Sequence, residues 1–286
     1  MHKKKLYRPK KPKIIINWKQ FASYPVIGGG FTVLLLIIGL LFLLRGCSTH
    51  HENLGNHTYR IARHSSWYPL QLMGREQYMQ GLTTDLLFAI ARERDLKIEL
   101  LSAGAGQLYD NLNQGFYDGV LGILTPNVRN NESYLFSDPF YLTGPVLIVP
   151  VGSKITSIKD LEDKAIGVQS ASSAIVSLAA YPSINWKTFD NMNQGLDQLI
   201  NNRLDAVILD NLQAYAYTQG YYADKLKIVS SPLSDEGLRL ISKHNAFGKH
   251  LVQEFNAGLE ELKKKNIYKE LLHKWDFLDP DLSQEF

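Results

Sequence analysis

A few side chains in this chain have the chemistry needed to hold a small charged ligand. Arg129, within LTPNVRNNESYLFS, offers a guanidinium that can bind both oxygens of a carboxylate, unless it is a solvated loop cation. Asp210 ends an apolar stretch and can hold an ammonium group or cap the following helix. Ser172 and Ser173 stand at a predicted helix start, where free N–H groups attract a carboxylate.

Two adjacent aromatic residues, Trp67 and Tyr68, stand in SSWYPL, and an aromatic side chain there can belong to the core. His64 stands three residues before Trp67. No nucleophile, metal-binding set or phosphate loop accompanies it, which disfavours an enzyme and predicts neither cofactor nor metal.

Strands and helices alternate along the part of the chain that would position these residues. Short apolar segments predict strands, and apolar residues at helical spacing predict the helices between them. Strands are expected at 59–62, 96–101, 119–123, 145–150, 165–169, 186–189 and 205–209. Helices are expected at 82–94, 107–113, from 172, and at 194–201, 247–265 and 268–275. This order predicts two α/β units.

The N-terminal segment has a composition of its own. Residues 1–46 hold nine Lys and Arg and no acid, which leaves 22 basic and 28 acidic residues in the remainder, so the globular part offers no case for nucleic-acid binding. Residues 26–44 are almost entirely apolar and long enough to cross a bilayer. The basic residues before them place the remainder outside the cytoplasm. A cleavable signal peptide is the competing interpretation.

Cys47, the single cysteine, follows this segment directly in LRGC. The site resembles a bacterial lipoprotein cleavage site, although Arg45 fits that pattern poorly, so a lipidated cysteine and a retained helix both stay open. We divide the chain into a basic tail or signal region (1–25), an anchor or signal segment (26–46) and a polar tether (47–57). The tether's histidines lack a carboxylate or cysteine cluster, which favours a linker over a metal site.

Seven segments occur together in one order: 81–100, 115–121, 136–150, 157–174, 201–210, 231–245 and 266–275. In that order they resemble the extracytoplasmic amino-acid-binding proteins that feed ABC importers. The resemblance implies a two-lobed type II periplasmic-binding-protein fold, each lobe a mainly parallel sheet flanked by helices, after an N-terminal hydrophobic helix. Lobe 1 is expected at 58–145 plus 238–286, and lobe 2 at 146–237.

The resemblance also assigns roles within the cleft. It implies that Arg129, Ser172 and Ser173 hold the α-carboxylate and that Asp210 holds the α-ammonium. Thr125 supplies a hydroxyl or backbone contact. The resemblance also implies an aromatic shelf beneath the ligand at Trp67, or at its neighbour Tyr68, and places His64 in the cleft. Aligning Asp118 and Phe136 with the family puts Arg129 one residue early and Asn130 in the usual arginine position.

His64 replaces an acid that relatives specific for basic amino acids tend to carry, which argues against lysine or arginine as the ligand. Glu76 or Asp110 could compensate from elsewhere. We expect a membrane-tethered monomer that delivers a small ligand, an amino acid in the first instance, to an ABC permease. A sensory module that signals to a separate membrane protein and a dehydratase-like enzyme are the alternatives.

Overall fold

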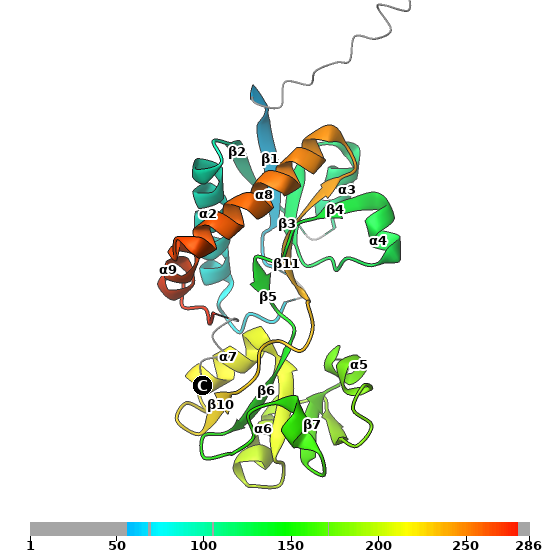
Figure 1. Ribbon diagram of the computed structural model, residues 1–286, viewed down its shortest axis with the longest axis vertical. Coiled ribbons are helices and arrows are strands. Elements are labelled where there is room, and N and C mark those ends of the chain that lie inside the picture. Colours follow the sequence, from blue (N-terminus) through cyan, green and yellow to red (C-terminus); the bar gives the residue numbers. More distant parts are fainter. Residues whose placement is uncertain (1–55, 68–69, 105, 171, 280–286) are drawn as a thin grey trace, which may run out of the picture. The chain divides into compact units, whose positions relative to one another are not determined.

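The computed structural model describes residues 56–67, 70–104, 106–170 and 172–279, and within them the chain forms two sheets (Figure 1). The first has the order β2-β1-β3-β11-β4, with β5 paired to β11, and the second has the order β10-β6-β9-β7-β8. The first contains β1 (Thr58–His64), β2 (Lys97–Ala103), β3 (Gly119–Gly122), β4 (Tyr134–Phe136), β5 (Tyr141–Leu142) and β11 (Gly237–Lys243). The second contains β6 (Pro145–Pro150), β7 (Ala165–Gln169), β8 (Asn185–Phe189), β9 (Ala206–Asp210) and β10 (Leu226–Ile228).

The pairing within each sheet is mixed. In the first, β1 pairs in parallel with β2 and β3, whereas β11 pairs antiparallel with β3, β4 and β5. In the second, β7 pairs in parallel with β8 and β9, whereas β6 is antiparallel to β9 and β10. The two-lobed α/β fold is therefore confirmed. The sheets are mixed and not mainly parallel as expected, because β6 and β11, which carry the chain between the sheets, pair antiparallel with their neighbours. The predicted lobe boundaries stay a prediction.

Strand β6 buries apolar side chains on both of its faces. In β6, Val146 and Ile148 join one hydrophobic cluster while Leu147 and Val149 join another. Successive side chains of a strand point to opposite faces, so a run of apolar residues requires cover on both faces. The apolar segment at 145–150 was predicted from this feature, and its bounds are those of β6.

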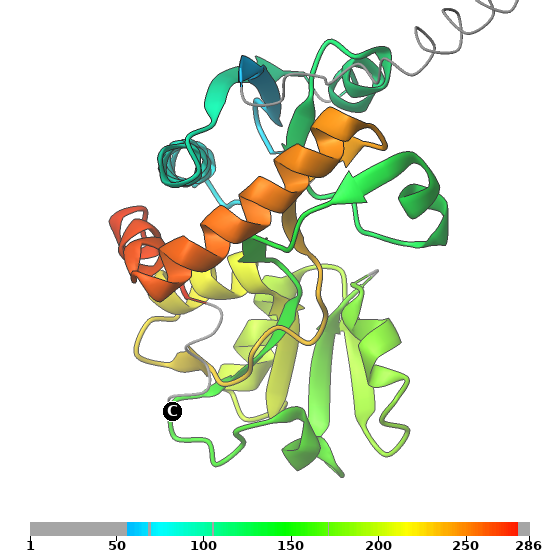
Figure 2. The same cartoon turned by 45° about the horizontal axis from the view of Figure 1, so that its top comes forward.

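Helices cover these faces. Near the first sheet lie α2 (Glu76–Glu93), α3 (Leu108–Gln114), α4 (Val128–Ser133), α8 (Ala246–Lys264) and α9 (Ile267–Lys274). Figure 2 shows α8 lying across this sheet, and both α2 and α9 contact α8. Near the second lie α5 (Ala174–Leu178), α6 (Met192–Ile200), α7 (Asn211–Gln219) and the short 3₁₀ helix η3 (Ile158–Leu161).

The predicted helices were mostly found within a few residues of their expected bounds. The first begins earlier than expected, at Glu76, and α5 begins two residues late, at Ala174. Seven of the described elements had no explicit prediction: the helices α4, α7 and η3 and the strands β4, β5, β10 and β11. In α7 the polar side chains of Asn211 and Gln213 are buried together with Leu212 and Ala214, so polar and apolar residues of its first turn do not follow a helical period.

Two segments connect the sheets and are bonded to each other (Figure 1). The outward segment, before β6, donates from the N–H groups of Thr143 (2.8 Å) and Gly144 (3.2 Å) to the carbonyl oxygen of Glu236. Leu142 pairs with Gly237 on the returning strand. A Cβ atom at Gly237 would lie 2.6 Å from the carbonyl oxygen of Tyr141, so only glycine fits this close approach.

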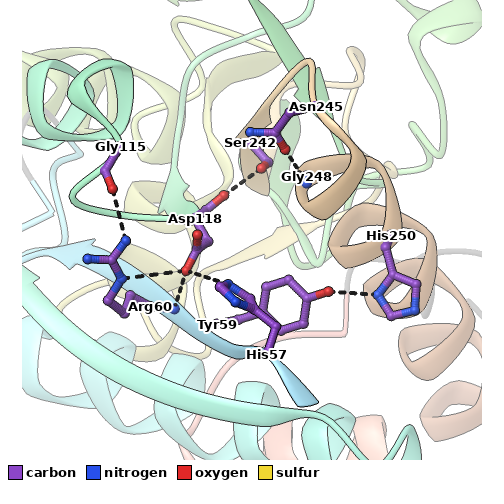
Figure 3. A network of polar contacts seen from close by, with 9 residues as sticks. All are labelled: His57, Tyr59, Arg60, Gly115, Asp118, Ser242, Asn245, Gly248 and His250. Carbon is purple, nitrogen blue, oxygen red and sulfur yellow. Dashed lines mark hydrogen bonds and ion pairs between the residues drawn. The ribbon is translucent and has the colours of Figure 1, made fainter. Parts of the chain in front are cut away.

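A polar network holds the beginning of β1 (Figure 3). The Asp118 carboxylate accepts from the backbone N–H of Arg60 at 2.8 Å and lies 3.2 Å from Nε2 of His57 and 3.6 Å from Nε of Arg60. The hydroxyl of Tyr59 is bonded to Nδ1 of His250 at 2.8 Å, which joins β1 to α8. Burial raises the pKa of Tyr59 to about 12, so its hydroxyl stays protonated.

The predicted N-terminal apolar helix, Cys47 and Tyr68 lie outside the described residues. Within the described ranges, we find no helix whose length and apolar content suit a bilayer.

Candidate functional site

The larger of two adjoining cavities has a volume of about 550 Å³ and lies where β1 and β3 end. Its described lining combines apolar and uncharged polar side chains: His64, Trp67, Leu108, Tyr109, Gly122, Ile123, Leu124, Thr125, Asn127 and Asn130. The carboxyl ends of parallel strands are the usual place for a ligand in an α/β sheet. This cavity therefore offers an uncharged compartment.

His64 lines this cavity and has one ring nitrogen without a hydrogen-bond partner among the described residues. Its Nδ1 accepts a hydrogen bond from the backbone N–H of Ser66 at 3.0 Å, so a neutral imidazole carries its proton on Nε2. That Nε2 is buried and has no hydrogen-bond partner among the described residues. Burial lowers the pKa of His64, which favours the neutral ring. The site thus holds a hydrogen-bond donor without a charge.

Trp67 belongs both to the core and to the cavity wall. Its side chain is 1% exposed and packs in the largest hydrophobic cluster of the first lobe. Its backbone has φ of 59°, in the left-handed region, which is strained for a bulky residue. The indole N–H is buried and unpaired within the described structure. The core and ligand-shelf alternatives are therefore compatible, and the ligand role stays a prediction.

The smaller cavity has a volume of about 290 Å³ and is lined from both sheets. It shares Ile123 and Thr125 with the larger one, and its described lining adds Leu70, Gln71, Thr143, Asp210, Leu212, Gln213, Glu236 and Gly237. First-lobe loops, both connecting segments and the start of α7 thus meet here. A ligand in this cavity would touch both lobes.

Asp210 is positioned by the pairing of β9 with β6, in which it lies opposite Pro145. It precedes α7, yet its side chain forms no capping hydrogen bond. Burial raises the pKa of Asp210, and the nearby charge of Glu236 raises it further, while a hydrogen bond from Ser172 opposes the shift. The simple capping role is thus not the one observed, and the carboxylate faces a cavity.

Ser172 and Ser173 lie beside the two acids. Ser173 donates from its hydroxyl to Oε2 of Glu236 at 2.9 Å, and Ser172 bonds to Asp210. The Ser172 hydroxyl also accepts from the N–H of Ala174 at 3.2 Å. Both serines therefore bind carboxylates of the protein itself, and their contact with a ligand carboxylate stays a prediction.

Arg129 and Thr125 are placed differently. Thr125 lines both cavities, and its carbonyl oxygen accepts from the side-chain amide of Asn130 at 2.8 Å. Arg129 lies on α4, is exposed, and is absent from the described lining of either cavity. Asn130, which occupies the family's usual arginine position, does line the larger cavity. The structure therefore brings Thr125 and Asp210 to one cavity without Arg129.

Sequence reasoning proposed no ligand role for seven lining residues that carry polar side chains: Gln71, Tyr109, Asn127, Asn130, Thr143, Gln213 and Glu236. Glu236 stands directly before Gly237, within a segment recognised as the return crossing, so its place near a cleft was open to inference. Asn127 and Asn130 lie in the same stretch as Arg129, whereas Gln71, Tyr109 and Gln213 lie in stretches without a distinctive motif. Among the described residues, no three His, Cys, Asp or Glu side chains group as metal ligands do.

Sequence comparisons identify relatives of this chain. The chain is 25% identical over 224 residues to a Neisseria gonorrhoeae protein named "Probable histidine-binding protein", with 76% of this chain and 82% of that one covered. It is 26% identical over 200 residues to an arginine-binding extracellular protein of Bacillus subtilis, covering 68% and 77%.

A solved structure shares the fold. The unliganded, open L-cystine solute receptor of Neisseria gonorrhoeae superposes with a TM-score of 0.62 at 21% identity, over 78% of this chain and 94% of that one. The model of a single family matches residues 59–279, nearly all of the described structure. By fold and by sequence, this chain belongs to the bacterial extracellular solute-binding proteins, family 3.

Proposed function

We propose that the protein captures an amino acid between its two lobes, outside the cytoplasm, and delivers it without covalent change to an ABC-type permease. One observation carries the proposal: Asp210, from the second lobe, faces a cavity that the first lobe also lines. A ligand ammonium bound to Asp210 would also contact first-lobe residues such as Thr125. A ligand that contacts both lobes stabilises the arrangement that brings them together.

The names of relatives support the ligand class. Proteins named for histidine, arginine and glutamine binding match most of this chain. We propose that Asp210 receives the α-ammonium and Trp67 the ligand body. Arg129 stays the proposed carboxylate contact, because its long side chain begins one residue before Asn130 on the cavity wall. We also propose that the apolar segment 26–44, or lipidation at Cys47, tethers the protein to the membrane.

A thermal-shift screen of the full-length protein against the amino acids tests this function. Micromolar binding corresponds to about 8 kcal/mol, so millimolar ligand should raise the melting temperature by mass action. Asp210→Ala should abolish the shift, because the ammonium loses its counter-charge. A parent protein that responds to no amino acid would refute the proposed function. An Asp210→Ala variant that responds like the parent would refute only the site.

A further inference from the structure

The smaller cavity contains two acidic side chains and, in its described lining, no basic side chain that would balance their charge. Asp210 and Glu236 both line it, and none of its described lining residues is a lysine or arginine. The four internal residues outside the described ranges are Tyr68, Pro69, Ala105 and Ala171, none of which is basic. The larger cavity next to it also has no lysine or arginine in its described lining.

The topology explains how the two acids meet. The outward connecting segment binds both, since Pro145 pairs with Asp210 while Thr143 and Gly144 donate to the backbone of Glu236. The charge of Glu236 contributes to the raised pKa of Asp210, as expected for like charges held near each other. Ser173 fixes the Glu236 side chain with a hydrogen bond of 2.9 Å.

The charges of the site can be compared with those of a ligand. If Arg129 binds a ligand carboxylate, the three charged side chains of the site sum to one negative charge, and without Arg129 they sum to two. A zwitterionic ligand of zero net charge leaves at least one acid uncompensated in a partly buried cavity, which is unfavourable. A ligand with an additional positive charge removes that penalty.

We propose that the ligand carries a net positive charge and that Glu236 is a second ligand-binding carboxylate beside Asp210. This inference rests on the proposed binding function and names the ligand class for the same cavities. It differs from the expectation drawn from His64, because the acid comes from the return crossing instead of the end of β1. A basic amino acid fits this charge, as does an amino acid whose carboxylate is neutralised.

The adjoining cavity indicates where the uncharged part of the ligand lies. His64 and Trp67 are 7% and 1% exposed, and each holds a ring nitrogen with no hydrogen-bond partner among the described residues. Burying an unpaired polar group is costly, which marks these two residues as candidates for a ligand contact. Because Ile123 and Thr125 line both cavities, one ligand can span from the cavity with the two acids to the cavity that His64 and Trp67 line.

Two pairs of probes test the charge on the unmodified full-length protein in mild detergent. Arginine and citrulline have nearly the same shape but differ by one positive charge, and phenylalaninamide lacks the carboxylate charge of phenylalanine. For each pair in which a probe binds, isothermal titration calorimetry should show that the positively charged probe binds at least ten-fold more tightly than its neutral partner. Equal affinities within a binding pair, or tighter binding of any neutral or acidic amino acid, would overturn the proposal.

Glu236→Gln identifies the responsible residue. The amide keeps an acceptor for Ser173 but removes the charge, so the preference for the cation should fall at least five-fold while the neutral partner's affinity is retained. Asp235→Asn is the matched control, because this neighbouring acid has a side chain that is 86% exposed and lies outside the described cavity lining. An unchanged preference in Glu236→Gln would refute the role of Glu236.

These outcomes are separable from failure of the proposed function. If neither these probes nor any amino acid binds, the binding function itself is wrong. If a neutral amino acid binds best, the binding function stands and only the charge inference fails. Circular dichroism of both variants checks that they fold, and the affinity ratio of the unmodified protein does not depend on either variant.

Discussion

The two ends of strand β1 differ in the charges that surround their acids. At its beginning, the Asp118 carboxylate lies within 3.6 Å of nitrogens of His57 and Arg60, and Tyr59 is bonded to His250 (Figure 3). Buried ring nitrogens without a hydrogen-bond partner among the described residues occur at both ends: Nε2 of His57 at the beginning, and Nε2 of His64 and Nε1 of Trp67 at the other. Nearby, Asp210 and Glu236 face a cavity without a described cation.

This difference separates stability from binding. A carboxylate beside an arginine contributes to the folded state, whereas a carboxylate held near another acid costs stability until a ligand supplies the missing charge. The same residue type, aspartate, thus has opposite expected effects at positions 118 and 210.

The largest expected effect comes from Asp118→Asn. The change removes the negative charge from beside Arg60 and His57 while keeping the shape, and we expect a loss of about 2 kcal/mol of unfolding free energy. For a protein of this size that corresponds to a fall in melting temperature of about 4–8 °C. Ligand affinity should be unchanged. A variant as stable as the parent would show that the network does not contribute to stability.

Asp210→Asn should have the opposite sign. Because the folded-state pKa of Asp210 is raised, the ionised acid costs stability as pH rises through that pKa, and the cost vanishes below the unfolded value of about 3.8. The amide should therefore raise the melting temperature of the ligand-free protein at pH 7. The gain should shrink towards pH 3. A lower melting temperature at pH 7 would contradict the comparison.

Tyr59→Phe measures a single hydrogen bond of the paired end. The hydroxyl loses its bond to His250, so we expect a loss of about 1 kcal/mol, or about 2–4 °C in melting temperature. Tyr59→Phe in a His250→Ala background serves as the control, since the bond is already absent there. If Tyr59→Phe lowers the unfolding free energy equally in both backgrounds, the hydrogen bond to His250 does not contribute to stability.

The smallest effect is expected at a contact between the lobes. Tyr215 on α7 donates to Oδ1 of Asp276 at 3.1 Å, and the Arg75 guanidinium lies 5.1 Å from its ring. Tyr215→Phe keeps the ring and removes the bond, so stability should change by about 0.5 kcal/mol or less for this exposed contact. Ligand affinity, measured by calorimetry, should change more than stability if this contact opposes or assists closure.

The fold could be predicted well from the sequence because its signals are local. Strand β6 is a run of apolar residues, and α8 carries apolar residues at helical spacing. The expected bounds of α8 differ from those observed by one residue at each end. The helix α7 escaped prediction because buried residues fill its first turn, a property set by its neighbours.

The site was predicted less completely for a related reason. Asp210 was identified because it ends an apolar strand, a pattern visible within a few residues. Arg129 was chosen by residue type, but helix α4 places it outside the described lining and puts Asn130 on the cavity wall. A one-residue step along a helix turns a side chain by about 100°, so register decides which of two neighbours faces a cavity.

The sequence by itself determined the family, the two α/β units and the acid at the end of β9, because strand burial, helix period and motif order are properties of short segments. Only the tertiary structure brought Glu236 to Asp210, since the two belong to different segments joined through the outward connection at Thr143, Gly144 and Pro145. The balance of charge in the site depends on the distance between the two carboxylates in space. The order of residues along the chain does not specify that distance, which is set when the two connecting segments bond to each other.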